Sequence, residues 1–182
     1  MAAALVLASC GNEESADEPR PVETADVVPD LPPGWSVERN ADAGFAIGVP
    51  PGWQARNEGI SMTLRSPDRL VAATVVADRS DEAIEAQLDE LAETTITAVA
   101  GIRDLEPGDT RKFGHRYEAV AIEAKGVGGK RDIRQEFLLV VVRREDLATF
   151  TVLVAGNAEQ DTNGYDTDIE RMIRSLRSRS VG

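Results

Sequence analysis

The only histidine of the chain, His115, is the first residue to consider for catalysis. A lone imidazole rules out a multi-histidine metal site and a second histidine as proton shuttle. The residue types of a Ser-His-Asp triad are present, but the sequence contains no G-x-S-x-G turn that would expose a serine nucleophile. Beside the start of a predicted strand, a histidine is far more often a packing or surface residue. We therefore predict no catalytic residue and expect that the protein is not an enzyme.

Two short segments resemble ligand-binding motifs without matching them. The glycine run at residues 126–130 lacks the G-x-x-x-x-G-K-[ST] spacing and stands between strands, so no helix start follows to receive phosphate. Residues 161–168 carry oxygen ligands that calcium prefers, in Asp161, Asn163, Asp166 and Asp168. Their spacing does not fit an EF-hand, and acidic residues at a helix start are explained by the helix dipole. The sequence therefore predicts no metal site and no cofactor.

The charge balance restricts the class of partner. Asp and Glu number 32 against 20 Lys and Arg, which gives a formal net charge of −12. Nucleic acid and anionic lipid head groups would repel so acidic a chain, so we expect no nucleic-acid partner. The oligomeric state cannot be inferred from these numbers.

The single cysteine, Cys10, follows a short apolar run that ends in Leu7, Ala8 and Ser9. A lone cysteine cannot form an internal disulfide or a cysteine-based zinc site. Small residues before a cysteine resemble the bacterial lipobox, in which the cysteine becomes the lipidated first residue. The segment before Cys10 is short and lacks Lys and Arg, so the complete signal would begin upstream. We predict that residues 1–9 are a residual signal segment, with an incidental cysteine in a frayed cytosolic terminus as the alternative.

The next segment, residues 10–33, is rich in acidic residues and proline. Seven carboxylates face a single base, Arg20. Such a segment is too polar and too like-charged to bury a core, so we predict a disordered tether. A lipid-anchored protein needs such a tether to hold its folded domain clear of the bilayer.

Residues 34–182 carry the patterns of one folded domain. Alternating segments predict hairpins at residues 35–40 with 45–49 and at residues 62–65 with 71–78. A helix is expected from the N-cap Ser80, followed by strands at 112–115, 117–124, 132–143 and 148–154, and by a closing helix near Ile169. The apolar run 137–142 predicts a central strand covered on both faces. The order indicates an α+β domain: a mainly antiparallel sheet of six to eight strands with helices packed on its faces.

These features together resemble the PsbP/Mog1-like fold, and within it the LpqN-type lipoproteins of actinobacteria. The resemblance rests on the turn at residues 50–53, the mid-chain helix that ends near Gly101, Gly114 before a strand, Gln135 entering a long apolar strand, and the closing helix. It covers residues 34–178. It implies a non-enzymatic accessory, assembly or partner-binding protein, and no catalytic residue to carry over.

Five residues are candidates for contact with a partner. Exposed tryptophans are common binding anchors, and a basic helix face suits an acidic partner. The candidates are Trp35, Trp53, Arg171, Arg174 and Arg177. The alternative is that the tryptophans pack at the edge of the core and the arginines form a solvated helix face.

We predict a non-catalytic cell-envelope lipoprotein that is extracytoplasmic, is anchored to the membrane through Cys10, and binds a protein partner there. The alternative function is a carrier of a small apolar ligand or lipid. That function requires several hundred cubic ångströms of enclosed apolar space between helix and sheet.

Overall fold

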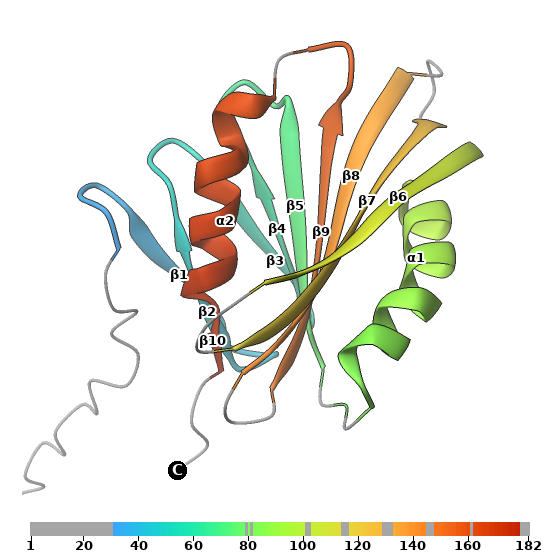
Figure 1. Ribbon diagram of the computed structural model, residues 1–182. Helices are drawn as coiled ribbons and strands as arrows, with labels where there is room; N and C mark the ends of the chain where they lie inside the picture. Colours follow the sequence, from blue (N-terminus) through green and yellow to red (C-terminus); the bar gives the residue numbers. More distant parts are fainter. Residues whose placement is uncertain are drawn as a thin grey trace, which may run out of the picture.

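The chain forms a small sheet, a large sheet and two α-helices within the residues that the structure describes (Figure 1). The structure is a computed structural model that describes residues 31–78, 80, 82–100, 103–113, 117–128, 133–144, 148–160 and 162–178. The predicted α+β class with a mainly antiparallel sheet is confirmed. Within the described residues, no helix has the length and apolar character needed to cross a bilayer.

The small sheet has the order β1-β2-β10, and both pairings are antiparallel. Strands β1 (Ser36–Asn40) and β2 (Phe45–Val49) form the first predicted hairpin. Strand β10 (Arg177–Ser178) joins the other edge of β2 from the end of the chain. Every residue of β2 is buried, as its apolar composition requires.

The large sheet has seven antiparallel strands in the order β3-β4-β5-β9-β8-β7-β6. Their bounds are β3 Gln54–Glu58, β4 Ser61–Arg65, β5 Val71–Asp78, β6 Arg103–Phe113, β7 Glu118–Gly128, β8 Ile133–Arg143 and β9 Thr149–Asn157. The pairing of β4 with β5 confirms the second predicted hairpin. Strand β8 lies between β7 and β9, in the central position that its long apolar run predicts.

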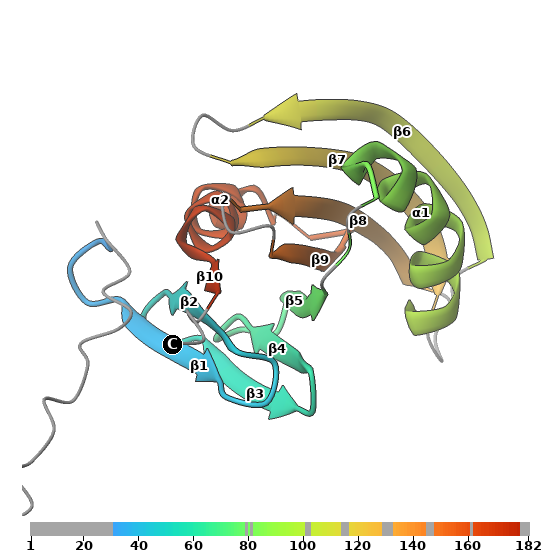
Figure 2. The ribbon, with the colours of Figure 1, turned by 90° about the horizontal axis from the view of Figure 1, so that it is seen from below.

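The two helices cover opposite faces of the large sheet. The side chains of β8 show this, since they alternate between two separate cores, one on each face. Helix α1 (Ile84–Ala100) packs Ile84 and Leu88 against the face that carries Leu139 and Val141. Helix α2 (Asp166–Ser175) follows a short 3-10 helix, η1 (Asn163–Tyr165). Figure 2 shows α2 between the small sheet and strands β8 and β9. The buried residues of α2 share the larger core with the even-numbered face of β8 and β9, which presents Val140, Val142, Phe150 and Val152.

A buried amide joins the two N-terminal hairpins. Asn40, at the end of β1, is 2% exposed. Its Nδ2 donates to the carbonyl oxygens of Gly59 and Ser61, both at 2.9 Å, and its Oδ1 accepts the amide of Ala43 at 2.9 Å. The turn between β1 and β2 is therefore fixed to the turn between β3 and β4.

Three local predictions differ from the structure. Strand β3 was not predicted, because all five of its residues are exposed and it carries no alternating apolar pattern. Ser80 is not the N-cap of α1, which begins at Ile84; its Oγ accepts the amide of Glu82 in a turn before the helix. Arg177 lies in β10 and not on the closing helix, since α2 ends at Ser175.

Two of the later strands are longer than predicted. Strand β6 extends over eleven residues, and its register with β7 is interrupted on both sides of the Glu106–Pro107 pairing. Strand β7 continues through the glycine run to Gly128. The positions of His115 and Gly101, and the connection after Gly128, lie outside the described residues.

Candidate functional site

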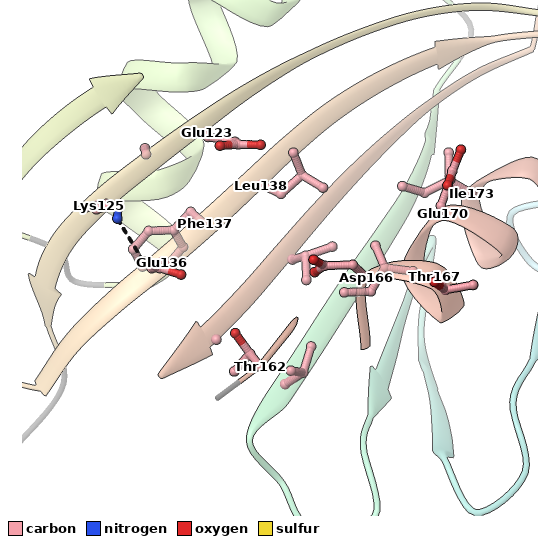
Figure 3. Close-up of a pocket in the computed structure, with 15 residues that line it drawn as sticks. Glu123, Lys125, Glu136, Phe137, Leu138, Thr162, Asp166, Thr167, Glu170 and Ile173 are labelled. Atoms are coloured by element: carbon pink, nitrogen blue, oxygen red, sulfur yellow. Dashed lines mark ion pairs between the residues drawn. The ribbon is translucent and has the colours of Figure 1, made fainter. Parts of the chain in front are cut away.

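A groove of about 550 Å³, partly open to solvent, lies between α2 and the large sheet (Figure 3). Strands β5, β7, β8 and β9 form one wall, and α2 with the residue Thr162 before it forms the other. The lining residues are Val71, Glu123, Ala124, Lys125, Glu136, Phe137, Leu138, Val154, Gly156, Thr162, Asp166, Thr167, Ile169, Glu170 and Ile173.

Strand alternation determines which side chains of β7 enter the groove. Ala119 and Ala121 pack into the core shared with α2. Because side chains on one face recur every second residue, Glu123 and Lys125 lie on the same face, farther along the strand. This face of β7 is therefore buried and apolar at one end, and charged at the end that lines the groove.

Strand β8 repeats this change of character in the paired register. Val140 and Val142 are fully buried beneath α2, Leu138 is half-buried, and Glu136 lines the groove. Glu123 pairs with Leu138 and Lys125 pairs with Glu136, so the charged ends of the two strands coincide.

The floor of the groove is apolar. Val154 and Ile169 are 6% and 7% exposed, and Ile173 is 2% exposed. Leu138 packs against the same core and is only half-buried. An apolar group that enters the groove can therefore remove further surface of Leu138 from water.

Among the described residues, the rim carries four carboxylates and one lysine: Glu123, Glu136, Asp166, Glu170 and Lys125. The Lys125 Nζ lies 2.9 Å from Glu136 Oε1, and this hydrogen bond raises the pKa of Lys125. The two side chains are 69% and 44% exposed, so this pair adds little to stability. Figure 3 shows the carboxylates of Glu123 and Asp166 facing the space between strands and helix.

On α2 the two rim carboxylates have different surroundings. Glu170 pairs with Arg174 one turn later, with 2.5 Å between Oε1 and the guanidinium. Asp166 stands in the first turn, where the helix dipole favours an anion. Among the described residues, no cation forms an ion pair with Asp166.

Strand β6 lies close to the backbone of β7 at Gly108. A Cβ at this position would lie 2.9 Å from the carbonyl oxygen of Glu123, closer than real Cβ contacts occur. The glycine therefore lets β6 pass the backbone of β7 where Glu123 enters the groove. Glu106 pairs with Lys125 in register, which brings a further exposed carboxylate to this wall.

The groove is suited to binding. The polar groups that the described residues contribute to its lining are carboxylates, one ammonium group and threonine hydroxyls. No group of three or more His, Cys, Asp or Glu side chains in the described part of the chain is arranged to hold a metal ion. Of the four candidate calcium ligands, Asp161 lies outside the described residues, and Asp166 and Asp168 occupy the first turn of α2.

None of the predicted partner-binding residues lines this groove, although Arg174 pairs with the rim residue Glu170. Trp53 is 9% exposed and contacts Tyr165 edge-to-face, with ring centroids 5.6 Å apart. Trp35 is half-buried against the same core. Arg171 and Arg174 are exposed on α2, which agrees with both alternatives, a solvated helix face and a face that contacts a partner.

Arg177 is half-buried and donates to the carbonyl oxygens of Arg174 and Leu176. Cys10, the predicted lipidation site, lies outside the described residues. A role in partner binding remains a prediction for Trp35, Trp53, Arg171, Arg174 and Arg177.

The groove residues were not identified from the sequence, although a signal was present. On alternate positions β7 changes from Ala119 and Ala121 to Glu123 and Lys125. When one face of a strand changes from apolar to charged, the element that packs against that face no longer covers it beyond this point. Which element forms the opposite wall depends on the docking of α2, and no local pattern contains that information.

Comparison with known proteins gives fold-level matches only. No protein-family model and no curated protein matches the sequence. The solution structure of cyanobacterial PsbP from Synechocystis matches with a TM-score of 0.59 and 14% identity, over 94% of this chain and 98% of that one. The Ran-binding protein Mog1p of Saccharomyces cerevisiae matches with a TM-score of 0.52 and 9% identity, over 79% and 95%.

LpqN of Mycobacterium tuberculosis, described as involved in cell envelope biogenesis, matches with a TM-score of 0.45 and 16% identity, over 78% of this chain and 88% of that one. That score is too low to carry an argument about this chain. The matches cover 98% of the PsbP structure and 95% of the Mog1p structure, so the chain has the PsbP/Mog1-like fold.

Proposed function

We propose that the protein is a non-catalytic cell-envelope lipoprotein whose folded domain binds a protein partner as an accessory or assembly module. The observation that carries this proposal is the groove beside α2, with its apolar floor and charged rim. An apolar centre surrounded by a polar rim is the usual anatomy of a surface that binds another protein.

The groove chemistry supports binding over catalysis. None of the described lining residues is a histidine, cysteine or serine, the residue types that most often act as proton shuttle or nucleophile. The yeast protein with this fold is described as Ran-binding, so the fold serves protein binding in that case. Ran itself is not proposed as the partner of this chain.

The proposed location rests on the N-terminal sequence. Cys10 after Leu7-Ala8-Ser9 supplies the lipid attachment, and the acidic residues 10–33 supply the tether. A flexible tether of this length has a root-mean-square reach of roughly 25–30 Å. That reach would let the groove meet a partner held in or near the same membrane.

The alternative function, a carrier of a small apolar ligand, is favoured by the volume of the groove. About 550 Å³ lies within the size of small-molecule sites. The groove is partly open, however, and its rim holds four carboxylates and a lysine, which an apolar ligand would have to desolvate. The lining therefore favours a partner with polar groups.

The test is site-specific photo-crosslinking in a bacterial host, from the full upstream reading frame. One photoreactive residue replaces Thr167, which is exposed in the groove, and a matched one replaces Asp89, exposed on α1. We expect one discrete protein adduct in the envelope fraction from Thr167 and none from Asp89. The Cys10→Ala variant should lose its lipid mass and its membrane fractionation.

Three outcomes would contradict the proposal in distinguishable ways. Equal adducts from Thr167 and Asp89 would show that the groove is not the partner site. Lipid that co-purifies with the wild-type chain, without a protein adduct, would favour the carrier. An unmodified wild-type chain that retains residues 1–9 would remove the membrane anchor.

A further inference from the structure

We propose that the acidic residues just before the folded domain, Glu23, Asp26 and Asp30, dock on a basic surface of the same chain. This surface, called the arginine surface below, consists of Arg39 on β1, Arg171 and Arg174 on α2, and Arg177 on β10. The occupant is thus a segment of this chain, and the contact involves neither the groove nor a lipid.

The chain joins the folded domain beside the arginine surface. A Cβ on Gly48 of β2 would overlap the side chain of Leu31 and would lie 3.1 Å from Ser175 Oγ, so Leu31 and the end of α2 meet over this glycine. Gly48 and Ala46 are two residues apart on β2, so they face the same side of the small sheet. The acidic segment that precedes Leu31 is therefore attached on this side.

Strand register places two of the arginines on the same side. Ala46 pairs with Arg39 across one edge of β2 and with Arg177 across the other, where β10 continues from α2 (Figure 2). Residues that pair directly across antiparallel strands point to the same face. Arg171 stands one turn before the last residue of α2 and on the same helix face. Guanidinium groups therefore flank the attachment point from the sheet and from the helix.

Most of the arginine surface lacks an anionic partner. Arg39 and Arg171 are exposed, and no described carboxylate forms an ion pair with either of them or with the half-buried Arg177. Arg174 differs, because it pairs with Glu170. An acidic segment that reaches this surface can therefore form new ion pairs without breaking ion pairs among the described side chains.

The acidic segment has the charge and the length for this contact. Residues 23–30 carry three carboxylates and no base. Eight residues span at most about 29 Å, whereas Arg171 is only about 6 Å from the end of α2 along the helix axis. A short segment attached beside its binding surface is held there at millimolar effective concentration. Several weak, exposed ion pairs are then enough to populate the contact.

In the lipid-anchored chain of the proposed function, this contact would shorten the tether. With residues 23–30 held on the domain, the free part shrinks from residues 10–30 to residues 10–22. Its root-mean-square reach then falls from roughly 25 Å to roughly 20 Å. Salt, or an acidic segment of a partner, would compete for the arginines and lengthen the tether again.

The experiment is paramagnetic relaxation enhancement by NMR on the full chain. Cys10→Ala removes the only thiol and the proposed lipid site, and Ala25→Cys then carries a nitroxide within the acidic segment. The Nε–Hε signals of the arginines report how close the nitroxide lies. We expect the signals of the arginine surface to be broadened at low salt and to recover as the salt concentration rises.

A matched pair of charge variants locates the contact. Arg39→Gln with Arg171→Gln removes two charges from the arginine surface, and Arg65→Gln with Arg134→Gln removes two exposed charges from strands β4 and β8. Loss of two exposed ion pairs should lower the ratio of docked to undocked segment about fivefold, read from the remaining signal of Arg177. The control should stay within about twofold of the parent. The dispersion of the amide spectrum checks that both variants fold.

The same contact can be tested from the acidic side. Glu23→Gln, Asp26→Asn and Asp30→Asn together should reduce the broadening at least as much as the variant of the arginine surface.

Three results would overturn the inference: broadening spread evenly over all arginines, broadening that salt leaves unchanged, or equal effects of the two arginine variants. The proposed function fails separately, through the crosslinking and lipidation tests, because the NMR experiment uses no lipid and changes no residue of the groove.

Discussion

The amide of Asn40 offers the sharpest test of how the fold is held together. The substitution Asn40→Asp keeps the size of the side chain and the acceptor for the Ala43 amide, but replaces the donor group by oxygen. Two hydrogen bonds, to the carbonyl oxygens of Gly59 and Ser61, are lost in a site that is 2% exposed. Each such bond contributes about 1 kcal/mol, and repulsion between the introduced carboxylate and the two carbonyls adds a comparable amount. We expect the free energy of unfolding to fall by about 3 kcal/mol at neutral pH.

The effect should depend on pH in a defined direction. The carbonyl oxygens favour the protonated form, so the introduced carboxyl at position 40 has a higher pKa in the folded state than in the unfolded state. The folded state then binds more protons in acid, and the penalty shrinks as the pH falls through that raised pKa. Urea unfolding followed by circular dichroism, at neutral pH and in acid, measures both effects.

The matched control is Asn57→Asp in β3. The Nδ2 of Asn57 also donates to a carbonyl of the facing hairpin, that of Arg39, at 2.9 Å, but the bond is exposed. Water replaces that bond easily, so the loss should be about 0.5 kcal/mol or less. Equal losses for Asn40→Asp and Asn57→Asp would refute the claim that the buried amide holds the hairpins together.

Two further predictions concern the ends of α2. Ser175→Ala should lower the free energy of unfolding, measured in urea, by about 1–3 kcal/mol. The reason is that the buried Ser175 Oγ accepts the amide of Gly48 at 2.7 Å and donates to the carbonyl oxygen of Met172 at 2.6 Å. A loss below about 0.5 kcal/mol, the size typical of a surface substitution, would contradict this prediction. Hydrogen bonds from the Ser66 hydroxyl and then from the Tyr165 hydroxyl lower the pKa of Asp68 from its ordinary value, and Tyr165→Phe removes the second of these, a donor at 2.6 Å from Asp68 Oδ2. A lowered carboxylate pKa stabilises the fold above the unfolded pKa and is lost as the pH falls through the folded one, so the melting-temperature difference between wild type and variant should be largest at neutral pH and shrink in acid.

The sequence predicted those elements whose burial leaves a local pattern. The alternating apolar residues of β5 and the doubly apolar run of β8 follow from burial on one face and on two faces. Strand β3 leaves no such pattern, because its residues are all exposed and backbone pairing with β4 holds it in place. The length of strand β6 could not be predicted, because it contains Pro107 and its register with β7 is interrupted.

Burial of the tryptophans also depends on tertiary contacts. Trp53 follows a proline-glycine turn, and such turns usually lie at the surface. The ring is covered because Tyr165, more than one hundred residues later, packs against it. Since neither residue implies the other locally, the sequence left both the exposed and the packed alternatives open.

The groove follows from a difference in length between the elements that form it. Helix α2 has ten residues and spans about 15 Å, whereas the eleven residues of β8 span about 36 Å. One short helix cannot cover the whole length of such a strand. The side chains of β8 on this face change accordingly, from the buried Val140 beneath the helix to Glu136 in the groove. The cavity is therefore set by the backbone, while its specificity is set by exposed charges that contribute little to stability. Substitutions such as Glu123→Gln can for that reason change what the groove binds without unfolding the domain that forms it.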